Sequence, residues 1–306
     1  MIVAGVLREM NKIQKIAIPY MGSKRGIAER LITEMQNLKP KAKYFIDVFG
    51  GGGAMSFTAL QMGYKVWYND YNEKIYKFVK FCVDRVRSGE RSEFGMFPRE
   101  FYDFVDRETF KKAIQTDTDF GRYCMFIWSF GNKGTTYLFG KNLEEWKKNG
   151  HNFIMFRDKA SQEYIEEHYK DSCNKFIGGI LNKDTWIERR HEFANIILKI
   201  EAIKVAGLKH LYDHLTYDEF RALSNKVIVD DINKYCPDIP KKNYKNHKSK
   251  RLEELKQLQQ LQQLQQLDNF KMTNLSYEEM DFSQYKDEET IIYCDSPYRG
   301  TTSYEF

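Results

Sequence analysis

Short apolar runs near both ends of the chain predict β-strands. Their length and their content of aromatic and branched residues are typical of buried strands, and they lie at residues 44–48, 64–68 and 291–294. Helices are expected from Ala54 through Leu60, directly after the first run, and through Ile27 and Leu31 before it. Strands that alternate with helices in this way predict an α/β fold.

The long stretch between the second and third runs has a different pattern. Within residues 184–208, apolar side chains recur at helix-like intervals, at Trp186, Ile187, Phe193, Ile197, Ile200 and Val205. The sequence therefore predicts a mainly helical insert, which we place at residues 76–240, followed by a linker at residues 241–267.

Leucine repeats with a period of three near the end of this linker, at positions 252, 255, 258, 261, 264 and 267. This period matches neither the 3.6 residues per turn of an α-helix nor the 3.5 of a coiled coil, so the leucines are expected to spread around a helix surface. We interpret the stretch as a low-complexity spacer that packs irregularly, with partner binding through the leucines as the alternative.

Composition narrows the class of protein only a little. The net charge of +5, from 48 Lys and Arg against 43 Asp and Glu, is compatible with a polyanionic partner. The five cysteines form no C-x-x-C pair, which indicates free thiols in a reducing cytoplasm. The six histidines have no ligand spacing, so no metal site is predicted. No apolar run reaches membrane length, and the first seven residues do not fit a signal peptide.

Residues 50–53 are four consecutive glycines between the first predicted strand and its helix. Glycine lets a backbone approach a ligand closely, and Asp70, at the end of the next strand, is placed to accept hydrogen bonds from the ribose of a nucleoside cofactor. The loop departs from the Gly-x-Gly-x-x-Gly pattern and follows Asp47. These features favour S-adenosylmethionine over NAD, and a Rossmann-type NAD enzyme stays as an alternative.

The third apolar run ends in Asp295-Ser296-Pro297-Tyr298. An acid, a proline and an aromatic ring that leave a strand together fit a pocket for a flat ring that carries an amino group. The Asp295 carboxylate and the Ser296 carbonyl are acceptors for that amino group, and Tyr298 is suited to stacking on the ring. An ordinary exit from strand to turn is the alternative, because Asp, Ser and Pro are common turn formers.

Four motifs in this order resemble those of Dam-like adenine-specific DNA methyltransferases. They are Pro-Tyr-Met-Gly-Ser-Lys at 19–24, Asp-Val-Phe-Gly-Gly-Gly-Gly-Ala at 47–54, Tyr-Asn-Asp at 68–70 and Asp-Ser-Pro-Tyr at 295–298. The resemblance covers residues 18–72 and 270–304 well and the middle of the chain loosely. It implies a Rossmann-like S-adenosylmethionine-dependent methyltransferase fold with an inserted helical DNA-recognition domain, here residues 76–240. Residues 1–75 and 268–306 then form the cofactor-binding and catalytic domain.

The resemblance also implies roles for single residues. Tyr20 and Lys24 match positions that contact the methionine part of the cofactor, with Lys24 suited to its carboxylate, and Asp70 matches the ribose ligand. The remaining matched positions around the cofactor are Gly22, Asp47, Phe49, Gly50, Gly51, Gly52, Gly53 and Asp295.

At the catalytic tetrapeptide, Asp295 resembles the acid of the family's Asp-Pro-Pro-Tyr signature, and Tyr298 resembles its stacking aromatic. Ser296 departs from the family, which usually has a proline there. The carbonyl acceptor is retained, but the backbone is less stiff before Pro297, so we expect weaker preorganisation. Two acceptors on the adenine amino group free its lone pair for attack on the methyl group, after the base has been extruded from the duplex.

Two segments are candidates for contact with DNA. Residues 128–137 place polar donors between aromatic residues on a glycine-bounded loop, and we select Asn132, Lys133 and Thr135, with a packed surface turn as the alternative. Residues 241–251 are rich in cations, and we select Lys241, Lys242 and Lys245 as phosphate contacts, with a solvated basic linker as the alternative.

Only eight residues follow the tetrapeptide, whereas members of the resembled family continue with further strands. We therefore expect the C-terminal strands of the sheet to be missing and a complementing C-terminal polypeptide to restore activity. The functional expectation is a cytoplasmic adenine-specific DNA methyltransferase of the restriction–modification type, for which the sequence indicates no particular nuclease. The alternatives are a DNA-binding remnant with impaired catalysis and one half of a split methyltransferase.

Overall fold

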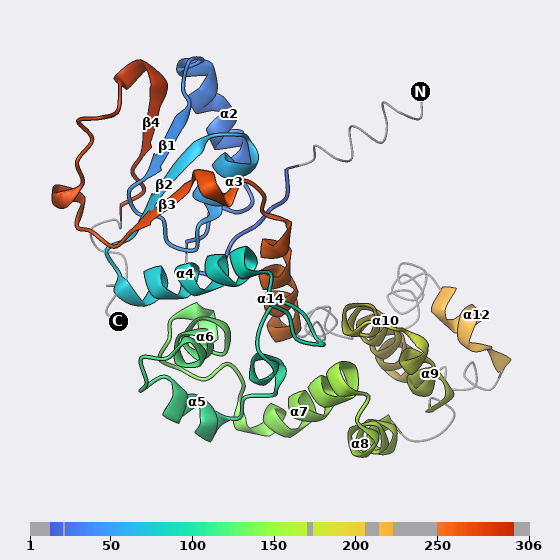
Figure 1. Ribbon diagram of the computed structural model, residues 1–306. Helices are drawn as coiled ribbons and strands as arrows, with labels where there is room; N and C mark the ends of the chain where they lie inside the picture. Colours follow the sequence, from blue (N-terminus) through green and yellow to red (C-terminus); the bar gives the residue numbers. More distant parts are fainter. Residues whose placement is uncertain (1–12, 21, 170–173, 206–213, 223–249, 297–306) are drawn as a thin grey trace, which may run out of the picture. The chain divides into compact units, whose positions relative to one another are not determined.

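A computed structural model describes five stretches of the chain, residues 13–20, 22–169, 174–205, 214–222 and 250–296 (Figure 1). Its strands are β1 (Tyr44–Asp47), β2 (Lys65–Asn69), β3 (Phe270–Thr273) and β4 (Thr290–Tyr293). Its α-helices are α2 (Ala28–Leu38), α3 (Ala54–Gln61), α4 (Glu73–Ser88), α5 (Arg107–Ala113), α6 (Asp119–Ile127), α7 (Lys141–Phe156), α8 (Lys159–Tyr169), α9 (Asn174–Gly179), α10 (Trp186–Val205), α12 (Tyr217–Ala222) and α14 (Lys250–Gln259).

Short 3-10 helices complete the described elements: η1 (Arg99–Tyr102), η2 (Phe130–Asn132), η4 (Ile180–Asn182), η6 (Gln260–Gln263), η7 (Leu267–Asn269), η8 (Tyr277–Glu279) and η9 (Asp287–Glu289). The three strands and the helices that the sequence predicts in these regions are confirmed, with shifts of a few residues at their ends.

The four strands form one parallel sheet in the order β3-β2-β1-β4. The register places Asp47 of β1 beside Tyr68 of β2 and beside Tyr293 of β4. The chain runs outward from β1 through β2 to β3 and then returns to place β4 on the other side of β1. The strand order therefore reverses between β1 and β4, and the predicted α/β class is confirmed at this level.

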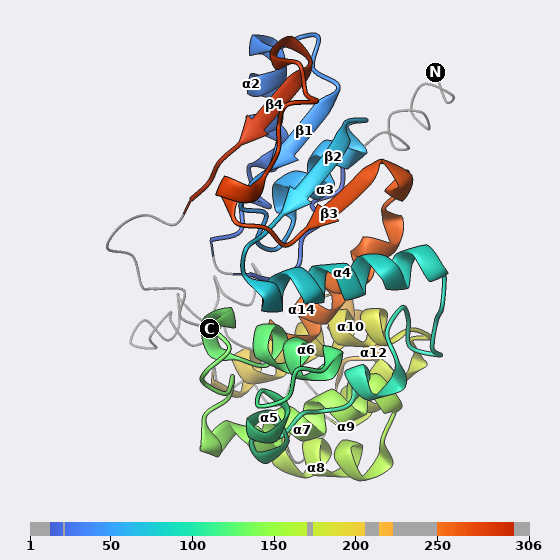
Figure 2. The ribbon, with the colours of Figure 1, turned by 60° about the vertical axis from the view of Figure 1, so that its left-hand side comes forward.

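The two faces of the sheet are covered by different kinds of structure. Because side chains alternate along a strand, Asp47 faces α3 and contacts its Ser56, while the neighbouring Ile46 faces the other way. Helices α2 and α3 lie side by side on the first face (Figures 1 and 2). The opposite face, with Ile46 and Trp67, is covered by the connection from β3 to β4 through Leu275, Met280, Phe282 and Tyr285.

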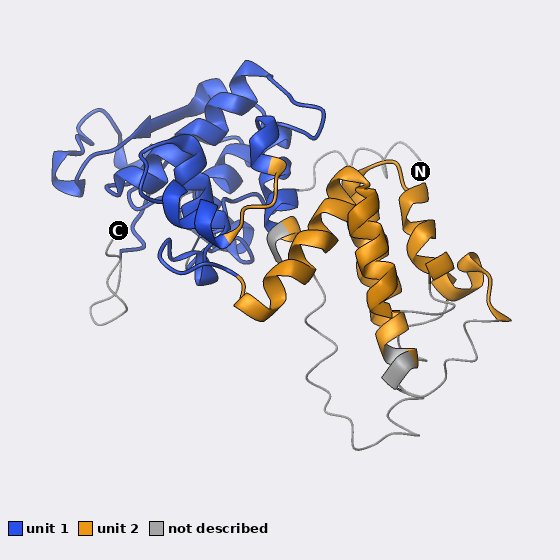
Figure 3. Ribbon diagram, turned by 90° about the horizontal axis from the view of Figure 1, so that it is seen from below, with its two compact units in different colours: residues 1–101, 107–138, 254–306 blue, residues 102–106, 139–253 orange. Residues whose placement is uncertain are grey.

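The chain divides into two compact units, shown in separate colours in Figure 3. Unit 1 comprises residues 1–101, 107–138 and 254–306 and contains the sheet, and unit 2 comprises residues 102–106 and 139–253. Unit 1 thus contains α4, α5 and α6 in addition to the segments predicted to bind cofactor. These units are defined by packing, whereas the division predicted from the sequence is one of function, so that functional division stays a prediction.

The described part of unit 2 is helical. Helix α7 packs on α8 and α10, and the rings of Phe176 and Phe220 stack with their centroids 4.0 Å apart. The buried Lys199 Nζ donates to the carbonyls of Phe220 and Arg221 at the end of α12, where a positive charge is favourable.

The leucine repeat differs from the sequence-based interpretation, because Leu252, Leu255, Leu258, Leu261 and Leu264 are buried rather than spread around a helix surface. Residues three apart on an α-helix differ by about 60° around its axis, so three leucines span only about 120°, the width of one apolar stripe. From Gln260 the chain continues as the 3-10 helix η6, in which residues three apart eclipse. Leu261 is buried within η6, and Leu264 is buried directly after it, where the backbone is extended.

No helix among the described residues is long and apolar enough to cross a membrane. Within the same residues, Cys82, Cys124 and Cys294 are free thiols, and no group of three or more His, Cys, Asp and Glu side chains is arranged to hold a metal ion. The other two cysteines lie outside the described part of the chain.

Candidate functional site

Three carboxylates lie at the carboxyl ends of three neighbouring parallel strands. Asp47 ends β1, Asp70 follows β2, and Asp295 follows β4 after one intervening residue. In open parallel sheets, ligands bind outside the carboxyl ends of the strands at the point where the strand order reverses, which is here between β1 and β4. The fold therefore brings together three acids that are far apart in the sequence at the edge where a ligand is expected.

The glycine loop connects β1 to α3 along this edge. Gly53 adopts a φ of +75° directly before α3, a conformation that favours glycine. A Cβ at Gly52 would collide with the carbonyl of Ile18, whose own N–H donates to the Gly52 carbonyl at 2.8 Å. The loop is thus packed against the segment that precedes α2, and both positions require glycine.

Asp70 joins the glycine loop to the end of β2. Its Oδ2 accepts from the backbone N–H of Gly51 at 2.7 Å, and its Oδ1 accepts from the N–H of Asn72 at 2.8 Å. Burial raises the pKa of Asp70, and these two hydrogen bonds oppose that rise. A carboxylate has room for about four hydrogen bonds, so Asp70 retains acceptor capacity for ligand hydroxyls.

Asp47 is almost completely buried, with 1% of its surface exposed. Its Oδ2 accepts from Ser56 Oγ at 2.7 Å, whereas its Oδ1 has no hydrogen-bond partner among the described residues. Burial raises the pKa of Asp47 to about 7, the hydrogen bond from Ser56 opposes the rise, and the charges of Asp70 and Asp295 add to it. A buried oxygen without a partner is costly and suits a cationic or hydrogen-bond-donating ligand.

Lys24 and Asp295 form an ion pair, with Lys24 Nζ 2.5 Å from Asp295 Oδ2. Tyr20, from the same segment as Lys24, packs against Gly51 and against the ring of Phe126. Gly22 is exposed and has a φ of +76°. The segment before α2 therefore brings two of its predicted site residues to the strand ends, Tyr20 to the glycine loop and Lys24 to Asp295.

A hydrogen-bond network that sequence reasoning missed fixes the strand ends around the site. Asn69, 1% exposed, donates to the carbonyls of Val48 and Leu275 at 3.1 and 3.0 Å, and its Oδ1 accepts from the Leu275 N–H and from Thr273 Oγ1. Asn274 donates to the Asp70 carbonyl at 2.6 Å. Asn69 directly precedes Asp70, but its partners on other strands leave no local signal in the sequence.

The loop after α6 holds the first set of predicted DNA contacts. Asn132 donates from its side chain to the Phe126 carbonyl at 2.5 Å and to Glu254 Oε1 at 3.2 Å, so this amide fixes the loop. Lys133 and Thr135 are exposed. Sequence reasoning did not select Phe130, which is 66% exposed on the same loop.

The remaining predicted site residues are placed as follows. Phe49 is partly buried beside the sheet core, with its ring centroid 6.3 Å from that of Tyr277, and Ser296 is exposed. The predicted residues that lie outside the described part of the chain are Pro297, Tyr298, Lys241, Lys242 and Lys245.

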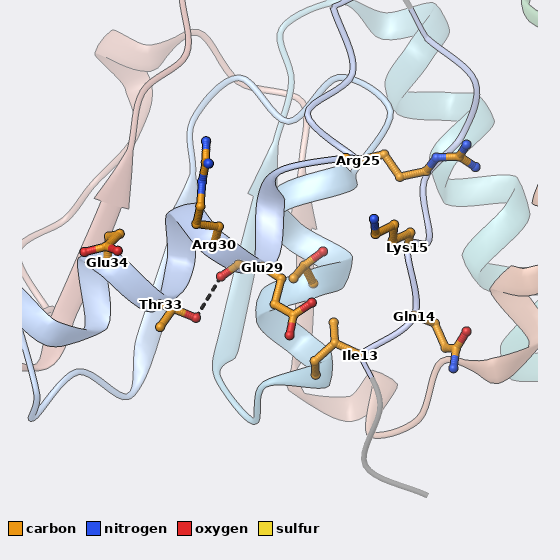
Figure 4. Close-up of a pocket in the computed structure, with 10 residues that line it drawn as sticks. Ile13, Gln14, Lys15, Arg25, Glu29, Arg30, Thr33 and Glu34 are labelled. Carbon is orange, nitrogen blue, oxygen red and sulfur yellow. Dashed lines mark hydrogen bonds between the residues drawn. The ribbon is translucent and has the colours of Figure 1, made fainter. Parts of the chain in front are cut away.

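A pocket of about 300 Å³ lies between the segment before α2, the first turns of α2 and Thr58 of α3 (Figure 4). None of the predicted site residues lines it. Its charged lining is mixed in sign and comes from Lys15, Arg25, Glu29, Arg30 and Glu34. Mixed charge on mostly exposed side chains indicates no ligand class.

A family described as D12 class N6 adenine-specific DNA methyltransferase matches residues 20–306, which is most of the chain and includes every predicted site residue. Neither a curated protein nor a solved structure matched.

Proposed function

Since the chain belongs to the D12 class N6 adenine-specific DNA methyltransferase family, we propose that it moves a methyl group from S-adenosylmethionine to the exocyclic amino group of adenine in duplex DNA. The observation that carries this proposal is the position of Asp47, Asp70 and Asp295 at the carboxyl ends of neighbouring parallel strands. Asp47 and Asp70 are suited to binding the cofactor, and Asp295 is suited to binding the target base.

The residues at the strand ends fit S-adenosylmethionine in charge and shape. Oδ1 of Asp47, which has no hydrogen-bond partner among the described residues, is suited to accept from the cofactor's ammonium group. The spare acceptor capacity of Asp70 suits the ribose hydroxyls. The glycine loop lets the backbone approach both parts closely. When bound, S-adenosylmethionine supplies an electrophilic methyl group on a sulfonium sulfur.

Asp295 and the backbone carbonyl of Ser296 are proposed to accept hydrogen bonds from the target amino group. These bonds localise the nitrogen lone pair, which is otherwise delocalised into the adenine ring. With its lone pair localised, the amino nitrogen would be able to take the methyl group from bound S-adenosylmethionine, whose sulfur would keep the electron pair of the broken bond, while one amino proton would pass to water. Tyr298 is proposed to stack on the extruded base.

The loop with Phe130 is proposed to contact DNA. Its exposed ring is suited to filling the gap that an extruded base leaves, while Lys133 and Thr135 supply donors for phosphates. Asn132 keeps the loop in shape through its bonds to Phe126 and Glu254. The basic residues 241–251 are proposed as further phosphate contacts, and the helical insert as the reader of the target sequence.

Binding measurements test this proposal against its alternatives. S-adenosylmethionine and NAD are titrated into the purified chain by calorimetry, and a mixed-sequence duplex is followed by gel shift with the same preparation. We expect binding of S-adenosylmethionine and of the duplex, with no binding of NAD. Duplex binding without S-adenosylmethionine binding would instead favour a DNA-binding remnant, and binding of NAD would contradict the proposal.

A further inference from the structure

The ion pair between Lys24 and Asp295 joins the segment before α2 to the end of β4. Its two charged groups are half-buried, with 30% of the Lys24 side chain and 23% of the Asp295 side chain exposed. Among the residues that the structure describes, Lys24 is the single ion-pair or hydrogen-bond partner of the Asp295 carboxylate. The ion pair is made through Oδ2 of Asp295, and Oδ1 has no ion-pair or hydrogen-bond partner among the described residues.

Lys24 reaches Asp295 from a fixed position in the backbone. Its carbonyl accepts from the N–H groups of Ile27 and Ala28 at 2.8 and 2.9 Å, which closes the turn that leads into α2. A side chain that leaves a closed turn samples fewer positions than one on an open loop, so less conformational entropy is lost when it forms the ion pair. The closed turn therefore lowers the entropic cost of the ion pair between Lys24 and the Asp295 carboxylate.

Asp295 also lies among like charges. Its negative charge is close enough to contribute to the raised pKa of Asp47, and so is that of Asp70. Like charges disfavour the ionised form of their neighbours and push them apart. The ammonium of Lys24 is in contact with Asp295, so it offsets the repulsion at the acid that the proposed function assigns to catalysis.

We propose that Lys24 is a positioning residue for Asp295, which holds Oδ2 so that Oδ1 faces the amino group of the target base. This inference rests on the proposed function and changes one part of it, because the sequence resemblance assigns Lys24 to the carboxylate of the cofactor. The two roles differ in what the side chain controls. A positioning role governs the methyl-transfer step, whereas a cofactor-ligand role governs the affinity for S-adenosylmethionine.

Substitution of Lys24 separates the two roles. Lys24→Met and Lys24→Arg are compared with wild type for kcat on adenine-containing duplex and for the Kd of S-adenosylmethionine by calorimetry. We expect Lys24→Met to lower kcat by roughly 10- to 100-fold, the effect of misplacing a reacting group, with the cofactor Kd within about threefold of wild type. Lys24→Arg is expected to restore most of kcat, since arginine also pairs with carboxylates.

Lys39→Met is the matched control, since Lys39, directly after the end of α2, pairs through Nζ with Asp287 at 2.6 Å in the same unit. Asp287 precedes β4, whereas Asp295 follows it. It is expected to leave kcat and the cofactor Kd unchanged. A Lys24→Met protein that binds S-adenosylmethionine at least about tenfold more weakly, which is about 1.4 kcal/mol, but keeps its kcat would overturn the positioning role. The calorimetry needs no turnover, so it tests the cofactor-ligand role of Lys24 even if the wild-type chain transfers no methyl group, a result that counts against the proposed function alone.

A double substitution provides an independent test. If Lys24 acts through Asp295, adding Lys24→Met to Asp295→Asn lowers the residual single-turnover rate by no more than about threefold, because the group that Lys24 positions is already altered. If the two losses multiply instead, Lys24 acts on something other than Asp295 and the inference is wrong.

Discussion

The backbone N–H of Gly51 donates a 2.7 Å hydrogen bond to Asp70 Oδ2, which ties the glycine loop after β1 to the end of β2. The same carboxylate accepts from Asn72 through its other oxygen, and the Asn72 side chain caps the start of α4. Asp70 therefore shapes the proposed ribose site and also supplies its acceptor.

Asp70→Ala is expected to weaken binding of S-adenosylmethionine much more than binding of DNA. The loss of a charge-assisted acceptor for ribose hydroxyls corresponds to roughly 10- to 100-fold in cofactor affinity. Calorimetry with the cofactor and gel shift with duplex DNA, on one preparation, measure the two effects. Asp268→Ala removes an exposed carboxylate elsewhere in unit 1 and serves as the control. An unchanged cofactor affinity in Asp70→Ala would remove Asp70 from the site.

The buried Asp47 is expected to make stability depend on pH. Its pKa in the folded chain is about 7, above its ordinary value of 3.8, so the folded state binds more protons than the unfolded state between these values. The contribution of Asp47 to the free energy of unfolding therefore falls as pH rises from about 4 to about 7 and levels off above that.

Asp47→Asn cannot ionise and keeps an acceptor for Ser56, so it lacks this pH-dependent loss. Urea unfolding at pH 5 and pH 8 is expected to show that the stability of the variant relative to wild type is greater at pH 8. Asp268→Asn, at an exposed position, controls for the general effect of removing a charge. A stability difference for Asp47→Asn that is the same at both pH values would show that Asp47 is not a buried titrating group.

Phe130→Ala is expected to lower methyl transfer to a fully paired duplex by about tenfold, because base–aromatic stacking contributes about 1–3 kcal/mol per base. On a duplex in which the target adenine faces an abasic site, the base is already partly unstacked, so the loss is expected to be much smaller. Leu38→Ala removes another exposed apolar side chain of unit 1, on α2, and should affect neither substrate. Equal losses on the two duplexes would argue against a role for Phe130 in base extrusion.

Leu258→Ala is expected to destabilise the chain by about 2–5 kcal/mol, the range for large-to-small substitutions in a core. Leu258 is completely buried on α14, whereas Gln263 nearby in η6 is exposed. Urea unfolding of Leu258→Ala and Gln263→Ala compares the two positions. If the leucine variant loses less than about 0.5 kcal/mol, the usual limit for surface substitutions, the repeat is not part of the core.

Strands whose own residues form a short apolar run could be predicted from the sequence. Residues 44–48 and 291–294 are short apolar runs, and their strands β1 and β4 follow from composition and length. β3 was not predicted, because its residues Phe-Lys-Met-Thr alternate between apolar and polar and form no continuous apolar run. Its place in the sheet comes from pairing with β2. Pairing between segments far apart in the chain is a tertiary property and leaves a weak local signal.

Some site residues could likewise be selected from the sequence, whereas the contacts between distant segments around them could not. Asp47, Asp70 and Asp295 could be selected because each ends or follows a recognisable strand. The hydrogen bond from Ser56 to Asp47 depends on how α3 packs against the sheet. The bonds of Asn69 to Val48 and Leu275, which follow β1 and β3, depend on how the strands pair, and residue types alone do not specify this. The period of the leucine repeat led to a wrong interpretation of its burial. The period alone does not show that the α-helix ends at Gln259 and that a 3-10 helix follows.

The most direct test of the account identifies the methylated atom. The purified chain is incubated with S-adenosylmethionine that carries a labelled methyl group and with a mixed-sequence duplex, which is then digested to nucleosides for mass spectrometry. We predict label on the exocyclic nitrogen of deoxyadenosine with the wild-type chain, and its loss by more than about 100-fold with Asp295→Ala, since one of two acceptors for the reacting amine is removed. Label on cytosine, or on adenine at a similar rate with Asp295→Ala, would contradict the account.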